Sequence, residues 1–407
     1  MSDHLPNQAA LNGSPPRSGS SVGIRIGLIY AVMFLGVGVQ MPFFPVWLSA
    51  RGLGTGEIAT VLAMQLVVRV VAGPAVGYAA DRIGSRRGVV IALCATGLSG
   101  LLLLIGAEGY GAILSLAVLS ATARMSALPL IETIAVAESE AGGADYGRMR
   151  LWGSLTFIAG SIGAGAVLAR TNAEAILWLL IAVDIVLVAA AVLLPGERTV
   201  AGDARERQRT GGAVRRLVCH PVFLCFLASA GLVQAAHAVY YGFGTLHWRA
   251  AGIGEAVIGA LWATGVVAEV VLFAWAGPLV AWLKPQRLLL IGATAAIARW
   301  AITALEPSLW LLFAVQASHA LTYGATHLGS MYFLARAVPG NLHATAQSLY
   351  HALTVGVIMG PVMAASGPLY HQLGAHAWFA MAGLGVVAAG FALVVVARWQ
   401  GGRLMEP

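Results

Sequence analysis

The stretch GYAADRIGSRRG, residues 77–88, decides the fold, because it sets a short charged turn between two long apolar runs. Its charged residues and glycines are Gly77, Asp81, Arg82, Gly84, Arg86, Arg87 and Gly88. So short a connection leaves no room for a soluble domain, and we expect a tight hairpin between two membrane helices. Arginines hold such loops on the cytoplasmic side of the membrane.

Composition supports a membrane protein. Hydrophobic residues make up 59% of the 407 residues and charged residues only 10%, whereas a soluble domain carries about 25% charged residues. At about 20 residues per helix, the chain has room for roughly twelve spans. The net charge of +7 does not indicate a nucleic-acid partner, because the arginines lie singly or in short loops and Lys284 is the one lysine.

Charge sets the predicted topology. The predicted spans are 24–48, 57–80, 88–106, 111–137, 150–169, 174–195, 220–247, 255–283, 286–305, 308–337, 342–370 and 373–397. With the N-terminus inside, cytoplasmic segments hold 18 of the 24 Arg and Lys residues, and the outer loops hold only Arg51, Arg170 and Arg249. An even number of spans with both termini in the cytoplasm fits that excess.

The chain divides into two halves. We predict a disordered cytoplasmic tail (1–22), an N-terminal six-helix bundle (23–195), a cytoplasmic linker with six arginines (196–219), a C-terminal six-helix bundle (220–398) and a short cytoplasmic tail (399–407). An internal repeat at an offset of 200 supports this division: it aligns Arg69 with Glu269, Gly77 with Gly277 and Arg87 with Arg287. Ala281 stands where the first half has Asp81, so the repeat has decayed.

Ionisable side chains fall inside the predicted spans. They are Arg69, Arg124, Glu132, Asp184, Glu269 and Arg299, together with His237, His319, His327 and His351. A charge at the bilayer centre costs about 2.5–3.5 kcal/mol on insertion scales, so such residues face an interior and find partners. We expect them to line a shared route for a solute. Asp184 has no evident partner in the sequence, and a packing role and a functional role are equally open for it.

The hairpin matches the pattern G-x-x-x-D-x-x-G-x-R-R, and here the chain resembles the major facilitator superfamily. The resemblance implies an all-α membrane protein of twelve helices in two pseudo-symmetric six-helix bundles, with a substrate site between them. It also implies a gating role for Gly77, Asp81, Gly84, Arg86 and Arg87, in which Asp81 and Arg87 latch the inner side shut. The alternative is that the arginines only anchor the topology.

The text YGRMRLWG, residues 146–153, is similar to the start of the fifth helix in the lactose permease family. That resemblance implies that Glu132 and Arg150 bind substrate, and that Glu269, Arg299 and His319 couple transport to protons. There is one departure: Thr322 stands where that family has its proton-carrying glutamate. We therefore expect any carried proton to reside on Glu269 or Glu132.

Three further stretches resemble the phenylpropionate permease family: FFPVWLSARGL (43–53), QASHALTYGATH (316–327) and NLHATAQSLYHAL (341–353). The resemblance implies proton-coupled uptake of an aromatic acid such as 3-phenylpropionate across the cell inner membrane. The predicted substrate-binding residues are Glu132, Arg150, Arg69, Arg124, Gln316 and His327. We expect no enzyme activity, no metal and no cofactor besides the proton gradient, with a small-molecule substrate and the lipid bilayer as partners and a monomeric state.

Other functions stay open at this point. They are symport of a sugar or nucleoside, export of hydrophobic compounds, and a non-transporting membrane scaffold of the same fold. The chain lacks the G-x-x-x-x-G-K-[ST] loop of an ATP-driven pump and the H-E-x-x-H motif of a metalloprotease. A scaffold has no need for the charges inside the spans, so their presence favours transport.

Overall fold

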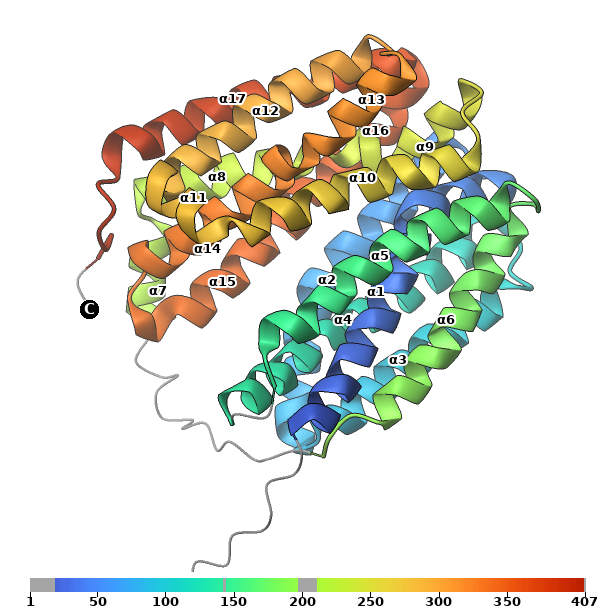
Figure 1. The fold of residues 1–407 in the computed structure, drawn as a ribbon, viewed down its shortest axis with the longest axis horizontal. Helices are drawn as coiled ribbons and strands as arrows, with labels where there is room; N and C mark the ends of the chain where they lie inside the picture. The colour runs from blue at the N-terminus through green and yellow to red at the C-terminus, as the bar shows by residue number, and fades with distance from the viewer. Residues whose placement is uncertain (1–18, 142–143, 197–210, 406–407) are drawn as a thin grey trace, which may run out of the picture.

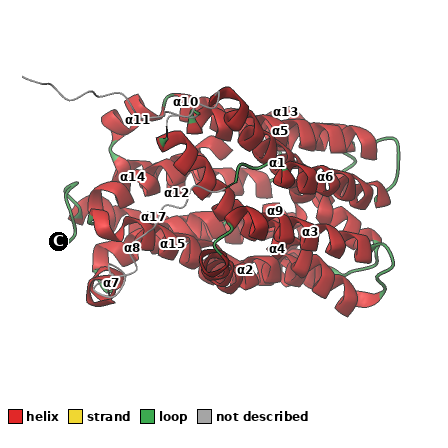
Figure 2. Ribbon diagram, turned by 90° about the horizontal axis from the view of Figure 1, so that it is seen from below, coloured by secondary structure: helices red, strands yellow, loops and turns green. Residues whose placement is uncertain are grey.

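The computed structural model describes residues 19–141, 144–196 and 211–405, and the secondary structure of these residues is helical throughout (Figure 2). The helices are α1 Gly19–Ala50, α2 Thr55–Ile83, α3 Arg86–Leu104, α4 Gly109–Glu140, α5 Tyr146–Leu168, α6 Glu174–Val192, α7 Gly211–Val218, α8 Pro221–Ala235, α9 Ala238–Ala250, α10 Glu255–Ala274, α11 Ala276–Leu283, α12 Pro285–Ala304, α13 Leu309–Ala317, α14 Thr326–Ala337, α15 His343–His351, α16 Gly360–Leu373 and α17 Ala377–Arg398. Two π-helical segments, η2 Ala320–Ala325 and η4 Ala352–Met359, and two 3-10 turns, η3 Gly340–Leu342 and η5 Gly374–His376, complete the described structure.

The prediction of an all-helical membrane protein is confirmed. Within the described residues, ten helical segments are long and apolar enough to cross a bilayer. One of these, Thr345–Arg398, is 54 residues long and contains the 3-10 turn η5, whereas the residues between Leu309 and Ala337 form three shorter helical pieces. The count of twelve spans therefore stays a prediction, as does the placement of both termini.

The stretch that decides the fold forms the predicted hairpin between α2 and α3. Helix α2 ends at Ile83, and Gly84 follows with a φ of 70°, a left-handed conformation that glycine adopts without a Cβ clash. Ser85 then starts α3, where its Oγ accepts a hydrogen bond of 3.1 Å from the main-chain N–H of Gly88. The glycine and the serine together make the reversal as short as the sequence requires.

The charged residues of the hairpin hold it in place. Arg86 Nη2 lies 3.6 Å from Asp81 Oδ1. Arg87 Nη2 donates a 2.6 Å hydrogen bond to the carbonyl oxygen of Val192, at the C-terminal end of α6. A cation at a helix C-terminus also interacts favourably with the helix dipole. Arg87 thus joins the hairpin to its own half of the molecule, and the predicted latch across the halves stays a prediction.

The helices form two groups, which we call the N-half (19–196) and the C-half (211–405) (Figure 1). Each predicted span of the N-half is one unbroken helix in the described residues. Four spans of the C-half are segmented, whereas α12 and α17 are unbroken. In the segmented spans α8 and α9 meet at Ala236–His237, α10 and α11 meet at Trp275, and π-helical segments interrupt the two spans that contain η2 and η4. π-helical turns are rare and occur frequently at functional sites.

The two halves meet mainly where α5 packs on α10 and α2 on α16, with further contacts of α9 on α1 and of η4 on α2. They diverge toward α7 and α15 (Figure 1). Glycines let the backbones touch. A Cβ placed on Gly165 would overlap the carbonyl oxygen of Glu255, one on Gly259 would overlap that of Ser161, and one on Gly367 would overlap that of Thr55. We call these contacts the seam. By the predicted topology it lies at the outer end of the helices.

The proposed tail and linker fall partly outside the described residues. Residues 1–18 and 197–210 are not described, so the predictions made for them are not addressed. Helix α1 begins at Gly19, slightly before the predicted end of the tail. Within the predicted linker, α7 forms a short helix whose Leu217 is buried against the C-half.

Candidate functional site

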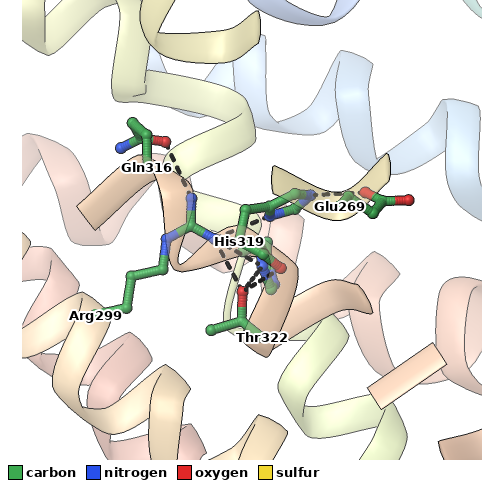
Figure 3. A network of polar contacts seen from close by, with 6 residues as sticks. Glu269, Arg299, Gln316, His319 and Thr322 are labelled. Atoms are coloured by element: carbon green, nitrogen blue, oxygen red, sulfur yellow. Dashed lines mark hydrogen bonds and ion pairs between the residues drawn. The ribbon is translucent and has the colours of Figure 1, made fainter. Parts of the chain in front are cut away.

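A fully buried arginine organises the polar interior of the C-half (Figure 3). Arg299 of α12 is 2% exposed. Its Nη1 lies 2.9 Å from His319 Nδ1, 2.9 Å from Thr322 Oγ1 and 3.4 Å from His237 Nε2, and its Nη2 donates to Gln316 Oε1 at 3.0 Å. We call these five residues the Arg299 cluster. Each of these partners of the guanidinium is neutral or can be neutral.

The arginine determines which nitrogen of His319 carries the proton. A guanidinium has donors and no acceptor, so Nδ1 of His319 must present its lone pair to Arg299 Nη1. In the neutral ring the N–H is then on Nε2. That nitrogen lies 3.6 Å from Oε2 of Glu269 on α10 (Figure 3). The geometry therefore connects the buried guanidinium to a carboxylate through one imidazole.

The local helix geometry sets three rings in a row along this side of the C-half. The π-helical turn η2 follows His319 directly. Tyr323 stacks on His319 with ring centroids 5.3 Å apart and an interplanar angle of 13°. The same tyrosine stacks on His327, at 5.9 Å and 3°. The row ends against Phe273, whose ring centroid is 6.1 Å from that of His327.

Arg150, at the start of α5, faces the C-half from the other side. Its guanidinium carbon lies 4.2 Å from the ring centroid of Phe34 and 5.8 Å from that of Tyr30, both on α1. Its charge acts on the carboxylate of Glu132 in its own half and on that of Glu269 in the other half. The predicted residues Glu132, Arg150 and Glu269 thus lie near enough for their charges to interact.

Asp184, which has no evident partner in the sequence, has one in the structure. Asp184 of α6 accepts a 3.1 Å hydrogen bond from Nη1 of Arg124 on α4, and both side chains are 1% exposed. The guanidinium of Arg124 is thus enclosed within the N-half and already faces a carboxylate, and its predicted contact with substrate stays a prediction. Direct pairing of this kind is how proteins accommodate buried charge.

Of the remaining predicted substrate-binding residues, Gln316 belongs to the Arg299 cluster, and Arg69 and His327 lie outside it. Gln316 is 1% exposed and serves as an acceptor for Arg299, so it positions the arginine. Arg69 on α2 and His327 on α14 are partly exposed. The charge of Arg69 acts on His351 in the opposite half, and His351 in turn acts on His327. Basic groups from both halves therefore lie near enough to interact, beside the middle of α2.

Sequence reasoning missed two contributors. Tyr323 was not singled out, although its position four residues after His319 and four before His327 is a helical spacing that predicts stacking. Thr322 was treated only as the loss of a glutamate, whereas its hydroxyl accepts from Arg299. Among the described residues, no group of three or more His, Cys, Asp or Glu side chains is arranged to hold a metal ion.

Comparison with known proteins places this geometry in a family. The model of the MFS_1 like family matches residues 24–381. The chain belongs to this family. It is 31% identical over 360 residues to a protein of Escherichia coli (strain K12) named "Probable 3-phenylpropionic acid transporter", which covers 88% of this chain and 93% of that protein.

Solved structures agree on the fold of this MFS_1 like protein. A crystal structure of the nucleoside transporter NupG has a TM-score of 0.79 at 17% identity and covers 92% of this chain and 99% of that chain. A crystal structure of a D-xylose-proton symporter has a TM-score of 0.71 at 13% identity and covers 95% and 98%. The chain is therefore a multi-pass membrane transporter of the major facilitator type and not an enzyme.

Proposed function

We propose that the chain imports an aromatic monocarboxylate together with a proton, by alternating access between its two halves. The observation that carries the proposal is the connection from Arg299 through His319 to Glu269, with distances of 2.9 Å and 3.6 Å. The name of the relative from Escherichia coli, a transporter of 3-phenylpropionic acid, supports an aromatic acid as the substrate. The proton gradient supplies the energy in place of a cofactor.

Glu269 is the group in this connection whose charge is free to change. A proton on Nδ1 of His319 would set N–H against N–H at 2.9 Å from a permanently charged guanidinium, so the imidazole stays neutral. Arg299 itself does not lose its proton in proteins. Proton uptake and release therefore fall to the carboxylate of Glu269, which is 18% exposed and within reach of water.

Arg150 is the best placed anchor for a substrate carboxylate. Arg124 is already paired with Asp184, and Arg299 is enclosed by four partners. Arg150 has the aromatic rings of Phe34 and Tyr30 as close neighbours, and its charge interacts with those of Glu132 and Glu269, with which a substrate anion would compete. Arg69, opposite His351, is the second candidate anchor. Bidentate pairing makes a guanidinium well suited to a carboxylate.

The ring of an aromatic acid would find aromatic surfaces on both sides. The partly exposed Phe34 lies beside Arg150 in the N-half, and the row of His319, Tyr323 and His327 lies in the C-half. Offset stacking of aromatic rings contributes about 0.5–1.5 kcal/mol beyond the burial of area. A carboxylate and a planar ring together fit these groups better than a polyhydroxylated sugar does.

Uptake of labelled 3-phenylpropionate into proteoliposomes, with and without an inward proton gradient, tests the proposal. We expect the gradient to accelerate uptake by wild-type protein and to have no effect on Glu269→Gln, because a glutamine cannot exchange a proton. Glu108→Gln, at an exposed position before α4, is the matched control and should behave as wild type. Gradient-driven uptake that is unchanged in Glu269→Gln would remove Glu269 from the mechanism.

A thermal-shift panel of aromatic acids, sugars and nucleosides on purified protein tests the substrate class. A ligand that binds only the folded state raises the apparent stability, by about 2.7 kcal/mol at 100 times its Kd. We expect stabilisation by 3-phenylpropionate, and weaker stabilisation by Arg150→Gln. A response to sugars or nucleosides alone would replace the aromatic acid in the proposal. We further propose that the transporter works as a monomer in the cell inner membrane, which the size of the purified protein in mild detergent checks.

A further inference from the structure

The helix that connects the cluster to the seam is broken at one residue. Between α8 and α9, the main-chain N–H of His237 bonds the carbonyl oxygen of Gln234, three residues back, at 3.1 Å. An unbroken α-helix would use the oxygen of Val233, four residues back. Main-chain oxygens inside a membrane must be satisfied by protein groups. Because of the break, the carbonyl oxygen of Val233 needs a different hydrogen-bond donor.

The side chain of His237 meets that demand. Its Nδ1 lies 2.9 Å from the carbonyl oxygen of Val233, and the residue is 0% exposed. Its Nε2 lies 3.4 Å from Arg299 Nη1 and 3.2 Å from Thr322 Oγ1. One imidazole thus holds the broken end of α8 with one nitrogen and the Arg299 cluster with the other.

The neighbours of the ring on both sides determine which form of this imidazole is present. The carbonyl oxygen of Val233 can only accept and Arg299 can only donate, so the proton of the neutral ring lies on Nδ1 and Nε2 presents its lone pair. That proton is the donor that the Val233 oxygen requires. If Arg299 turned away from Nε2, the proton would be free to move to Nε2. Nδ1 would then present a lone pair to the carbonyl oxygen, and the break would lose its hydrogen bond.

The groups around His237 agree with a neutral ring. Arg299 and His319 face it from α12 and from the residue before η2, and Tyr241 stacks on it from α9, with ring centroids 5.4 Å apart. The ring of Trp300 meets it edge-on at 5.1 Å. The nearest carboxylate connected to this group is that of Glu269, through His319. A change of charge on Glu269 therefore reaches His237 only through the cluster.

Helix α9, which starts immediately after His237, packs against the N-half. It contacts α1 and α2, and also α16 of the seam. Gly242 lies where a Cβ would be 3.7 Å from Leu62 of α2 and 3.7 Å from Met363 of α16. A change of angle at the break would move α9 relative to these helices. The position of α9 is thus mechanically connected to the closure of the seam.

We propose that His237 is a positioning residue that couples the Arg299 cluster to the seam, by supplying the hydrogen bond that keeps α8 and α9 bent only while its other nitrogen is held by Arg299. The inference rests on the proposed function, in which the charge of Glu269 changes during transport. The inference adds a route by which the change of charge on Glu269 moves helix α9.

Two substitutions separate the two ends of the imidazole. His237→Asn retains a donor near the position of Nδ1 and loses the contact with Arg299. His237→Gln retains a polar group near the position of Nε2 and loses the contact with Val233. A residue that only repairs the helix break would tolerate asparagine, whereas a residue that couples two sites tolerates neither. Unchanged unfolding temperatures and monodisperse elution show that each variant is folded.

The readout is the distance between spin labels on cysteines placed at Ala50 and Ala250, the exposed last residues of α1 and α9. The background replaces Cys94, Cys219 and Cys225 by alanine and is first shown to take up 3-phenylpropionate. Glu269→Gln serves as the permanently neutral form of the acid. We expect it to shift the ratio of short to long distances by about fivefold or more, the lower bound of typical allosteric coupling.

The same comparison in His237→Asn and His237→Gln decides the inference. We expect Glu269→Gln to change the distance ratio by less than about twofold in both variants, well below typical coupling. A full shift in His237→Asn would overturn the inference, because the hydrogen bond to the Val233 oxygen alone would then suffice for the response. A full shift in both variants would show that His237 has no role in it. If Glu269→Gln leaves the parent distances and the gradient-driven uptake unchanged, the proposed function fails, and the inference fails with it.

Discussion

Each half of the molecule encloses one arginine almost completely, and the two are neutralised in different ways. Arg124 of the N-half meets the carboxylate of Asp184 directly, at 3.1 Å. Arg299 of the C-half meets two imidazoles, a hydroxyl and an amide, and reaches the carboxylate of Glu269 only through His319. Arg124 therefore has a counter-charge in direct contact, whereas Arg299 has none. In the proposed mechanism this indirect connection leaves the carboxylate of Glu269 free to exchange a proton.

The helices of the two halves also differ, in how continuous they are. Those of the N-half are unbroken in the described residues, whereas four spans of the C-half are interrupted, at His237, at Trp275 and at the π-helical segments η2 and η4. Interrupted helices bend at defined points and expose main-chain groups to side-chain partners. The comparison teaches that, in the described residues, the helix breaks gather in the half that also holds the indirectly neutralised Arg299.

The largest effect is expected when the direct pair is broken. Asp184→Leu leaves Arg124 buried without a counter-charge, and removing one partner of a buried pair costs about 3–5 kcal/mol. The double variant Arg124→Met with Asp184→Leu should recover most of that loss and also retain uptake. Unfolding in detergent and uptake in proteoliposomes measure the two effects. Loss of uptake in a fully stable double variant would show that the N-half pair has a transport role.

A smaller effect is expected from the hydroxyl in the C-half. Thr322→Val keeps the shape of the side chain and removes one acceptor from Arg299, which costs about 1–3 kcal/mol when a buried donor is left unsatisfied. We expect a modest fall in unfolding temperature and a larger fall in gradient-driven uptake, because His319 and His237 share the same guanidinium nitrogen. Thr303→Val, whose hydroxyl bonds only the main-chain oxygen of Arg299, is the control. Equal uptake in both variants would contradict a special role for Thr322.

At the seam the two halves should behave alike. Gly165→Leu and Gly367→Leu each push a side chain into a main-chain oxygen of the opposite half, at a cost of about 1–3 kcal/mol for overpacking. We expect both to favour the state that is open at the outer end, seen as faster labelling of cysteines introduced next to the seam. Gly163→Leu, two residues away and facing open space, is the control. Faster labelling in only one of the two variants would show that the halves do not contribute equally to the seam.

The smallest effect on stability is expected at the hairpin. Asp81 and Arg86 are 3.6 Å apart and partly exposed, and surface pairs contribute about 0–1 kcal/mol. Asp81→Asn should therefore insert and unfold almost as wild type. If the hairpin is the predicted latch, turnover should still fall, which proteoliposome uptake at saturating substrate measures. Wild-type turnover would leave the arginines as topology anchors alone.

Sequence patterns were strongest where the cause is local. The hairpin at 77–88 follows from Gly84 and Ser85, which end one helix and begin the next within the same short turn. The repeat at an offset of 200 predicts that the two halves are related. The partner of Asp184 was not predictable, because Arg124 lies 60 positions away on another helix and no local spacing connects them.

The sequence by itself determined that this chain is a helical membrane transporter, because hydrophobicity, arginine placement and turn residues act on neighbours along the chain. Only the tertiary structure decided how each buried charge is satisfied. Hydrogen bonds and ion pairs depend on distances of a few ångström between helices that are far apart in sequence, and the break at His237 depends on a donor that Arg299, from a different helix, holds in place.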